Sequence, residues 1–154
     1  MVEWQLTIDS NHPSRLVRFW APVLDYEVQP PPEGFETWRA WYVSVGVPAD
    51  EFGPDNDGTD PIFDPTGAGP KIWFQIVPEP KYGKNRLHLD IDVGGGRAVP
   101  LEGRARRVEA RVAELLEAGG SVYRRYPADF EVVEDVDRYA VVMGDPEGNE
   151  FCVA

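Results

Sequence analysis

Six side chains combine residue types that bind ligands or metals with positions on the polar side of alternating segments. They are Gln5, Trp73, Gln75, His88, Asp90 and Cys152. Histidine and cysteine are ligands of soft or borderline metals, whereas amide side chains mainly form hydrogen bonds. Tryptophan adds the kind of aromatic wall found in small-molecule pockets. The set therefore predicts a polar and aromatic ligand-binding surface, with no catalytic residue identified.

Three of these residues also have purely structural interpretations. His88 on the polar side of a strand is equally consistent with a buried, hydrogen-bonded neutral imidazole. Cys152 fits a small buried hydrophobe, because free cysteine is among the most buried residue types. Asp90 and Asp92 lie on the same side as His88, and we expect at least one of them at the rim of the cup in solvent.

The side of the segment on which a tryptophan falls indicates whether it belongs to a pocket or to the hydrophobic core. Trp73 shares the polar side of its segment with Gln75, and we assign it to a pocket wall. We assign Trp4 and Trp20 to the hydrophobic core, because they fall on the apolar sides of their segments.

The first half of the chain reads as one helix and several strands. Residues that alternate or are rich in aromatic and β-branched types predict strands at 2–9, 26–29, 38–45 and 71–79. A helix begins near Pro13 and carries apolar residues at helical spacing, with a kink or early end expected at Pro22. Residues 46–70 are rich in proline, glycine and acidic residues, which predicts a functional lid or a mobile insert.

The second half repeats this order. The predicted strands are at 86–93, 121–126, 139–143 and 150–153, and the predicted helix ends at Gly119-Gly120. Its apolar stripe is Leu101, Ala105, Val108, Val112, Leu115 and Leu116. The chain therefore reads as βαβββ twice, at 2–79 and 86–154. The predicted fold class is α+β, with paired βαβββ modules forming an open cup-shaped mixed sheet and the helices outside.

Composition restricts the classes of function. The 154 residues carry a formal net charge of −12, which excludes non-specific nucleic-acid binding because that needs a basic face. No apolar run is long enough to span a membrane, and no secretory signal precedes the first strand, so we expect a cytoplasmic protein. The single cysteine forms no internal disulfide, and the length fits one domain over 1–154.

Three segments give the chain a resemblance to a known family. They read RLVRFW at 15–20, KNRLHLD at 84–90 and DPEGNEFCV at 145–153. Together with the doubled βαβββ order, they resemble the vicinal oxygen chelate superfamily in its glyoxalase and bleomycin-resistance branch. The resemblance spans nearly the whole chain except the acidic loop at 46–70.

The resemblance implies where a metal would be held. Metal-dependent members bind a divalent ion with one side chain from each of four strands, and the matching positions here are Gln5, Gln75, His88 and Cys152. Two of these four are neutral amides and one is a thiol, where the family uses histidines and glutamates. We therefore expect no metal or other cofactor, although the resemblance makes a divalent metal the alternative.

Three functions remain open from the sequence. The leading hypothesis is a protein that binds a small organic molecule in the cup, including sequestration of the bleomycin-resistance type. The alternative is a metal-dependent lyase, isomerase or dioxygenase of the same fold. A third is an interaction module whose acidic loop recruits a partner. The resemblance also implies a homodimer.

Overall fold

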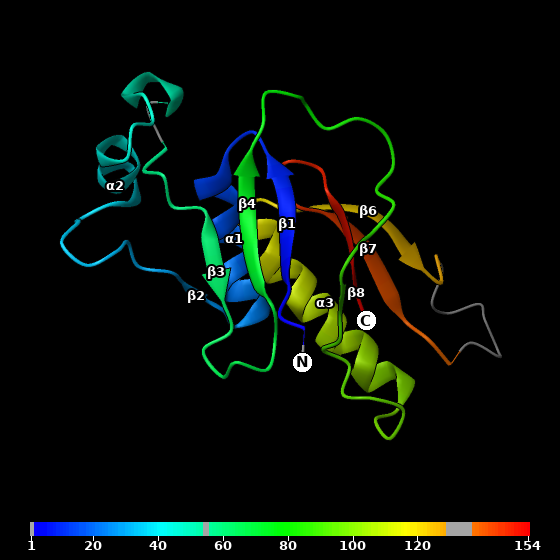
Figure 1. The fold of residues 1–154 in the computed structure, drawn as a ribbon. Coiled ribbons are helices and arrows are strands. Elements are labelled where there is room, and N and C mark those ends of the chain that lie inside the picture. Colours follow the sequence, from blue (N-terminus) through cyan, green and yellow to red (C-terminus); the bar gives the residue numbers. More distant parts are fainter. Residues whose placement is uncertain (1, 54–55, 129–136) are drawn as a thin grey trace. The chain divides into compact units, whose positions relative to one another are not determined.

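The computed structural model describes residues 2–53, 56–128 and 137–154, so part of the predicted loop 46–70 lies outside the described residues. The chain divides into two compact units, Met1–Pro80 and Lys81–Ala154. Each unit contains one four-stranded sheet and one long helix. Figure 1 shows the long helices α1 (Pro13–Leu24) and α3 (Leu101–Glu117). The prediction that residues 1–154 form a single domain with a shared cup stays a prediction.

The first unit follows the predicted βαβββ order with a helical insertion. Its elements are β1 (Gln5–Ser10), α1 (Pro13–Leu24), β2 (Glu27–Val28), α2 (Trp38–Ser44), the 3-10 helix η1 (Ala49–Glu51), β3 (Pro61–Phe63) and β4 (Lys71–Ile76). The sheet order is β1-β4-β3-β2. β1 and β4 are parallel, whereas β3 is antiparallel to both of its neighbours.

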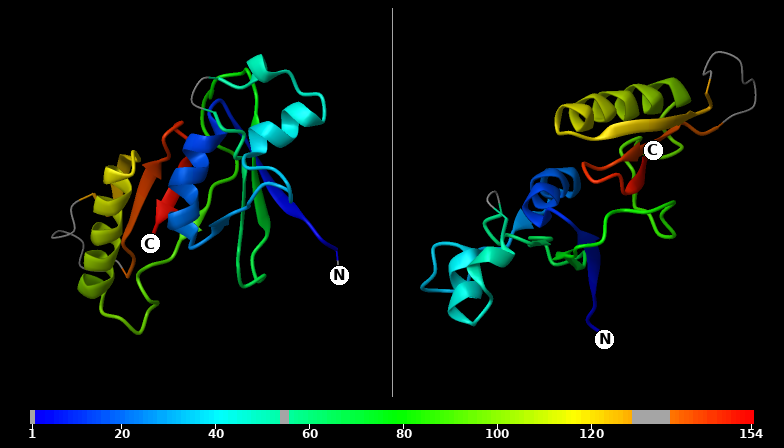
Figure 2. Two further views of the ribbon diagram at one scale, coloured as in Figure 1. Left: turned by 90° about the vertical axis from the view of Figure 1, so that its left-hand side faces the viewer. Right: turned by 90° about the horizontal axis from the view of Figure 1, so that it is seen from above.

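Helix α1 covers one face of this sheet, as both views in Figure 2 show. Pro13 occupies its first turn, where the missing N–H costs no hydrogen bond. The buried face of α1 includes Phe19 and Trp20, whose rings meet edge to face at 5.3 Å between centroids. Pro22 lies in the last turn, and the left-handed residue Asp25 caps the helix.

The N-terminal segment is shorter than predicted. β1 starts at Gln5, and the side chain of Trp4 is 67% exposed, so the assignment of Trp4 to the core is wrong. Trp20 is 3% exposed, which confirms its place in the core. Trp4 precedes the first paired residue, and alternation alone does not reveal where pairing begins.

The prediction of a strand at 38–45 is also wrong, because these residues form α2. The Thr37 hydroxyl caps the helix by accepting the Ala40 backbone N–H at 3.1 Å. Helical spacing then brings together the rings of Trp38, Trp41 and Tyr42, with centroids 4.9 to 5.8 Å apart. These contacts outweigh the strand propensity of aromatic residues.

The predicted loop at 46–70 contains an internal strand of the sheet. β3 lies between β4 and β2, and its Pro61 and Ile62 are buried. A strand of three residues between proline-rich and acidic segments is too short to give an alternation signal. The segment between β2 and β3 is therefore helical where the third strand was predicted. The third strand of the sheet is β3, which follows this segment.

The second unit repeats this topology. Its elements are β5 (Asp90–Ile91), α3 (Leu101–Glu117), β6 (Ser121–Tyr126), β7 (Ala140–Gly144) and β8 (Glu150–Val153). The sheet order is β5-β8-β7-β6, with β5 parallel to β8 and the other pairs antiparallel. Both units thus pair their first and last strands in parallel, which confirms the doubled βαβββ order and the α+β class.

Two details of the second unit differ from prediction. The strand predicted at 86–93 is confined to β5, Asp90–Ile91, so His88 precedes it. Leu116 is 46% exposed and does not belong to the buried stripe of α3. Gly119 ends this helix region with φ +99°, a conformation that glycine adopts without steric cost.

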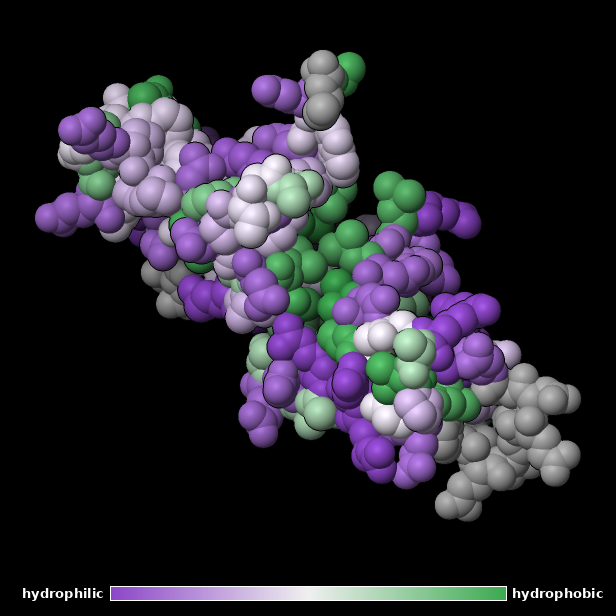
Figure 3. All heavy atoms as spheres, turned by 90° about the horizontal axis from the view of Figure 1, so that it is seen from below, coloured by the Kyte–Doolittle hydropathy of each residue, from purple (hydrophilic) through white to green (hydrophobic). Residues whose placement is uncertain are grey.

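The surface reflects the acidic composition. Hydrophilic residues cover much of the face drawn in Figure 3, as expected from 27 acidic and 15 basic side chains. No helix among the described residues is both long and apolar enough to cross a membrane.

Candidate functional site

A pocket of about 320 Å³ lies at the C-terminal end of β4, entirely within the first unit. Its floor includes Trp73 and Gln75, which lie two residues apart and therefore on the same side of the strand. The insertion contributes Tyr42, Phe52 and Asp60 to the walls. Three aromatic side chains thus line the pocket together with the polar side chains of Glu51, Asn56, Asp60 and Gln75.

Close packing at Gly58 holds the insertion in place. Gly58 has φ +78°, and a Cβ there would lie 2.7 Å from the backbone nitrogen of Arg39. The close approach lets the Arg39 N–H donate to the Asp57 carbonyl at 2.8 Å. On the other side, the Ser14 hydroxyl of α1 lies 2.9 Å from side-chain oxygens of both Asn56 and Asp57. These contacts fix the segment that leads into β3.

Asp60 is the central polar group of this pocket. Its Oδ2 accepts a hydrogen bond from the Tyr42 hydroxyl at 2.9 Å, and the nearby Trp73 side chain also favours the ionised carboxylate. Burial raises the pKa of Asp60, and the hydrogen bonds and the nearby charge of Lys71 oppose this shift without cancelling it. Burial and the charge of Asp60 likewise raise the pKa of Tyr42. The carboxylate is thus poorly solvated.

A group of side chains that could bind a metal ion lies in the second unit. One side-chain atom each from His88, Asp90 and Cys152 lies within 4.8 Å of the others. His88 Nε2 is 3.4 Å from Asp90 Oδ1, and Asp90 pairs in register with Cys152 between β5 and β8. Burial, followed by the charge of Asp90, raises the pKa of the Cys152 thiol. The neutral thiol is therefore a poor nucleophile.

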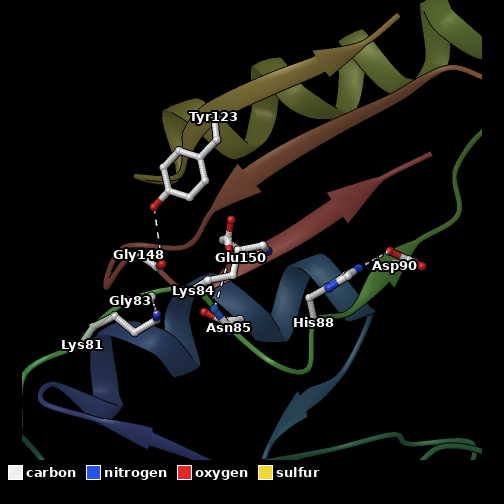
Figure 4. A network of polar contacts seen from close by, with 9 residues as sticks. All are labelled: Lys81, Gly83, Lys84, Asn85, His88, Asp90, Tyr123, Gly148 and Glu150. Carbon is white, nitrogen blue, oxygen red and sulfur yellow. Dashed lines mark hydrogen bonds and ion pairs between the residues drawn. The ribbon is translucent and has the colours of Figure 1, made fainter.

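A pocket of about 380 Å³ adjoins this group. Its lining includes Lys84, His88, Tyr123, Arg124, Glu150 and Cys152. Lys84 Nζ donates to Glu150 Oε2 at 2.7 Å, and the Tyr123 hydroxyl donates to the Gly148 carbonyl at 3.4 Å (Figure 4). The hydrogen bond from Lys84 lowers the pKa of Glu150. This pocket mixes positive, negative and neutral groups.

The Asp-Pro-Glu-Gly-Asn turn positions β8 beside that pocket. Asp145 is 3% exposed, and its Oδ1 accepts the backbone N–H groups of Glu147 and Asn149, each at 2.9 Å. Its Oδ2 accepts the Asn149 side-chain amide at 2.9 Å. The aspartate therefore organises the turn internally and places Glu150 at the start of the strand.

The structure places the six predicted site residues at three locations. Trp73 and Gln75 line the pocket of the first unit, and the three residues of the second unit form the group described above. Gln5 pairs with Lys71, whereas Gln75 pairs with Asp9. Four residues of strand separate these pairs, which is about 13 Å. Gln5 lines neither of the two pockets.

Sequence reasoning missed several residues of the first pocket, among them Tyr42, Phe52 and Asp60. Tyr42 was assigned to a strand, and Phe52 and Asp60 fell within the acidic loop. One signal was available, because Trp38, Trp41 and Tyr42 have the i, i+3, i+4 spacing of a helix. An alternation-based interpretation cannot find Asp60, whose neighbours give no periodic pattern.

Solved structures share the fold of this chain at low sequence identity. A glyoxalase/bleomycin resistance protein/dioxygenase family enzyme from Burkholderia phytofirmans PsJN is 14% identical, with a TM-score of 0.54 and coverage of 97% of this chain and 94% of that one. A hypothetical protein from S. aureus is 11% identical, with a TM-score of 0.56 and coverage of 99% and 92%. The fosfomycin resistance protein FosX from Mesorhizobium loti is 10% identical, with a TM-score of 0.52 and the same coverage.

These similarities show the fold, since identities this low carry no activity. No curated protein matches the chain. The model of the family described as "glyoxalase-like domain" matches residues 5–154, which include both βαβββ units. The chain therefore belongs to the glyoxalase-like domain family, within the vicinal oxygen chelate superfamily.

Proposed function

We propose that this protein binds a small organic molecule in the pocket at the C-terminal end of β4. The observation that carries the proposal is that the aromatic side chains of Tyr42, Phe52 and Trp73 line one pocket with the polar groups of Asp60 and Gln75. Small-molecule sites are typically apolar and aromatic concavities with a few converging polar groups. At about 320 Å³, this pocket suits a small ligand.

Sequestration of the bleomycin-resistance type is the form of this function that we favour. The described residues lining the pocket include no histidine or cysteine. Asp60, whose pKa is raised by burial, already accepts a hydrogen bond from Tyr42. A group fixed in this way suits recognition better than proton transfer to a substrate.

The test is ligand binding measured on two matched tryptophan variants. The wild-type protein is screened by tryptophan fluorescence and thermal shift against small metabolites and antibiotics. Trp73→Phe removes the indole that contacts Asp60, and we expect it to weaken binding of any hit by about fivefold. Trp4→Phe alters an exposed tryptophan outside the pocket and should bind as the wild type does. Equal binding by both variants, or no response across the panel, would contradict the proposal.

A metal-dependent lyase, isomerase or dioxygenase is the second candidate function. The specific observation in its favour is the convergence of His88, Asp90 and Cys152 within 4.8 Å. Imidazole nitrogen, carboxylate oxygen and thiolate sulfur are all zinc ligands, and three protein ligands leave a fourth position open. Donors at zinc bond lengths lie about 3.5 Å apart, so small side-chain adjustments would suffice.

The chemistry of these donors fits such an ion. The raised pKa of Cys152 keeps the thiol neutral, and a bound cation would favour its thiolate form. A metal would act there as a Lewis acid. Arg124, which lines the adjoining pocket, would bind and orient an anionic oxygen of a substrate.

Metal analysis tests this second candidate. Protein purified without chelator should contain stoichiometric zinc, nickel, manganese or iron, and His88→Ala should remove it. His12→Ala changes the other histidine, at the start of α1, and serves as the matched control. Absence of metal from the wild type, together with no uptake on dialysis against zinc, would exclude this candidate.

A further inference from the structure

We infer that the ligand of the first unit is an organic cation, a protonated amine or quaternary ammonium that carries a small apolar group. This inference rests on the proposed function and adds the charge of the ligand. It follows from the carboxylates, the aromatic faces and the placement of nearby basic side chains around the pocket.

The charged residues that line the pocket are all acidic. Asp60 and Glu51 contribute carboxylates, and no lysine, arginine or histidine is among the described lining residues. Because Glu51 is exposed and Asp60 is partly buried, one acid lies toward solvent and the other deeper in the pocket. Such an arrangement attracts a cation to the opening and repels an anion.

Asp60 has capacity for a further donor. A carboxylate offers about four acceptor positions, and the Tyr42 hydroxyl occupies one of them. The remaining cost of burying its charge is visible in its raised pKa. An ammonium group beside Asp60 would offset that cost through a charge-assisted hydrogen bond, which a neutral ligand forms less strongly.

The aromatic walls also favour a cation. The rings of Tyr42 and Phe52 lie 5.8 Å apart between centroids with an angle of 35° between their planes. Cations within about 6 Å of a ring centroid are attracted to its face. The guanidinium carbon of Arg39 lies 5.7 Å from the Phe52 centroid, so the Phe52 ring already makes a cation–π contact within the protein.

Neither Arg39 nor Lys71 neutralises the pocket. Arg39 donates from Nη2 to the Ala49 carbonyl at 3.0 Å, which directs its charge to the backbone of η1. Lys71 is close enough for its charge to lower the pKa of Asp60, but the described part of the chain has no ion pair between them. The carboxylate therefore keeps a net attraction for a ligand cation.

Calorimetric titration with probes of matched shape tests the inference. The probes are 2-phenylethylamine, 2-phenylethanol and phenylacetate, with indole and cyclohexyl counterparts of each charge, at neutral pH and low salt. We expect the amines to bind at least about tenfold more tightly than the alcohols, and the carboxylates to bind least. Raising the salt concentration should weaken the amines selectively.

Two aspartate variants complete the experiment. Asp60→Asn keeps the shape of the side chain and should abolish the preference for amines while retaining alcohol binding, which also reports that the pocket is folded. Asp50→Asn removes one exposed charge from η1 outside the pocket lining and should leave the preference unchanged. Alcohols that bind as tightly as amines would overturn the cation inference and leave the proposed function standing. Failure of every probe to bind at millimolar concentration would overturn both.

Discussion

The hydroxyl of Tyr42 donates to Oδ2 of Asp60 at 2.9 Å, and both side chains line the same pocket. This bond joins α2 of the insertion to the residue that precedes β3. The Asp60 carbonyl in turn accepts the backbone N–H of Phe74 at 2.9 Å. Asp60 thus links the insertion to the sheet through both its side chain and its backbone. The walls of the pocket are therefore held together by hydrogen bonds of the fold itself.

Replacement of Tyr42 by phenylalanine should destabilise the protein. It removes a donor to a partly buried carboxylate, so we expect a loss of about 1–2 kcal/mol in the free energy of unfolding. The pKa of Asp60 should rise further, because the lost hydrogen bond lowers it. Urea denaturation and a carbon-13 NMR titration of the carboxyl measure the two effects. Tyr82→Phe, at a tyrosine that is 80% exposed, is the control, and an equal effect there would refute the assignment.

Binding of an amine should depend on pH in a defined direction. The pKa of Asp60 lies above its ordinary value of 3.8, and only the ionised carboxylate attracts a cation. Amine affinity should therefore fall as the pH decreases through that raised pKa, while alcohol affinity stays constant. Tyr42, Trp73 and Lys71 face this carboxylate, and Glu51 lies at the same pocket. The pH dependence should disappear in Asp60→Asn and persist in Glu51→Gln; the reverse result would assign it to Glu51.

Two glycine variants separate steric contact from backbone strain. Gly58→Ala places a Cβ 2.7 Å from the Arg39 nitrogen in a residue with φ +78°. Gly67→Ala has a similar φ of +73° but no atom within 4 Å of its Cβ. We expect Gly67→Ala to cost about 1 kcal/mol and Gly58→Ala at least about 2 kcal/mol more, with reduced amide protection in α2. Equal losses in thermal denaturation would show that the contact at Gly58 is unimportant.

A carboxylate outside both pockets should affect stability at acid pH. Glu109 accepts two hydrogen bonds from Arg125, at 2.8 and 3.0 Å, and one from Tyr139. These bonds, led by those from Arg125, lower the pKa of Glu109 against the opposing effect of burial. Its stabilisation is therefore complete above the ordinary value of 4.5 and is lost as the pH falls through the lower folded-state pKa.

Glu109→Gln tests this assignment. At neutral pH we expect a loss of about 1 kcal/mol, a modest figure because the ion pair is partly exposed to solvent. The variant should also lose less stability than the wild type on acidification. Glu102→Gln, in the exposed pair with Arg106, provides the control and should change stability by less than about 0.5 kcal/mol. Parallel pH profiles for wild type and Glu109→Gln would contradict the role of Glu109.

Periodicity predicted the repeated topology because most elements bury one side. Ile72 and Phe74 alternate with polar positions in β4, and Val108 and Val112 recur on one face of α3. Local patterns of this kind follow directly from strand and helix geometry. The turn at Asp145 was also visible, since its side chain accepts hydrogen bonds from neighbours in sequence.

The sequence predicted only some of the residues that line the pocket of the first unit. Trp73 and Gln75 lie on a regular strand, so their shared side followed from alternation. Tyr42 and Asp60 meet through contacts between segments separated by 18 positions, and the close approach at Gly58 that allows this has no periodic signature. Local propensity and periodicity report only on neighbours in sequence, so they do not predict contacts between distant segments.

Nitrogen-15 NMR of the five tryptophan indoles tests the central claim most directly. The Trp73 indole, whose resonance is assigned with Trp73→Phe, lines the pocket near Asp60, whereas Trp4 is exposed outside it. On titration with 2-phenylethylamine, the Trp73 resonance should shift in a saturable manner while that of Trp4 stays in place. A Trp73 resonance that does not move with any small molecule that the protein binds would show that this pocket is not the binding site.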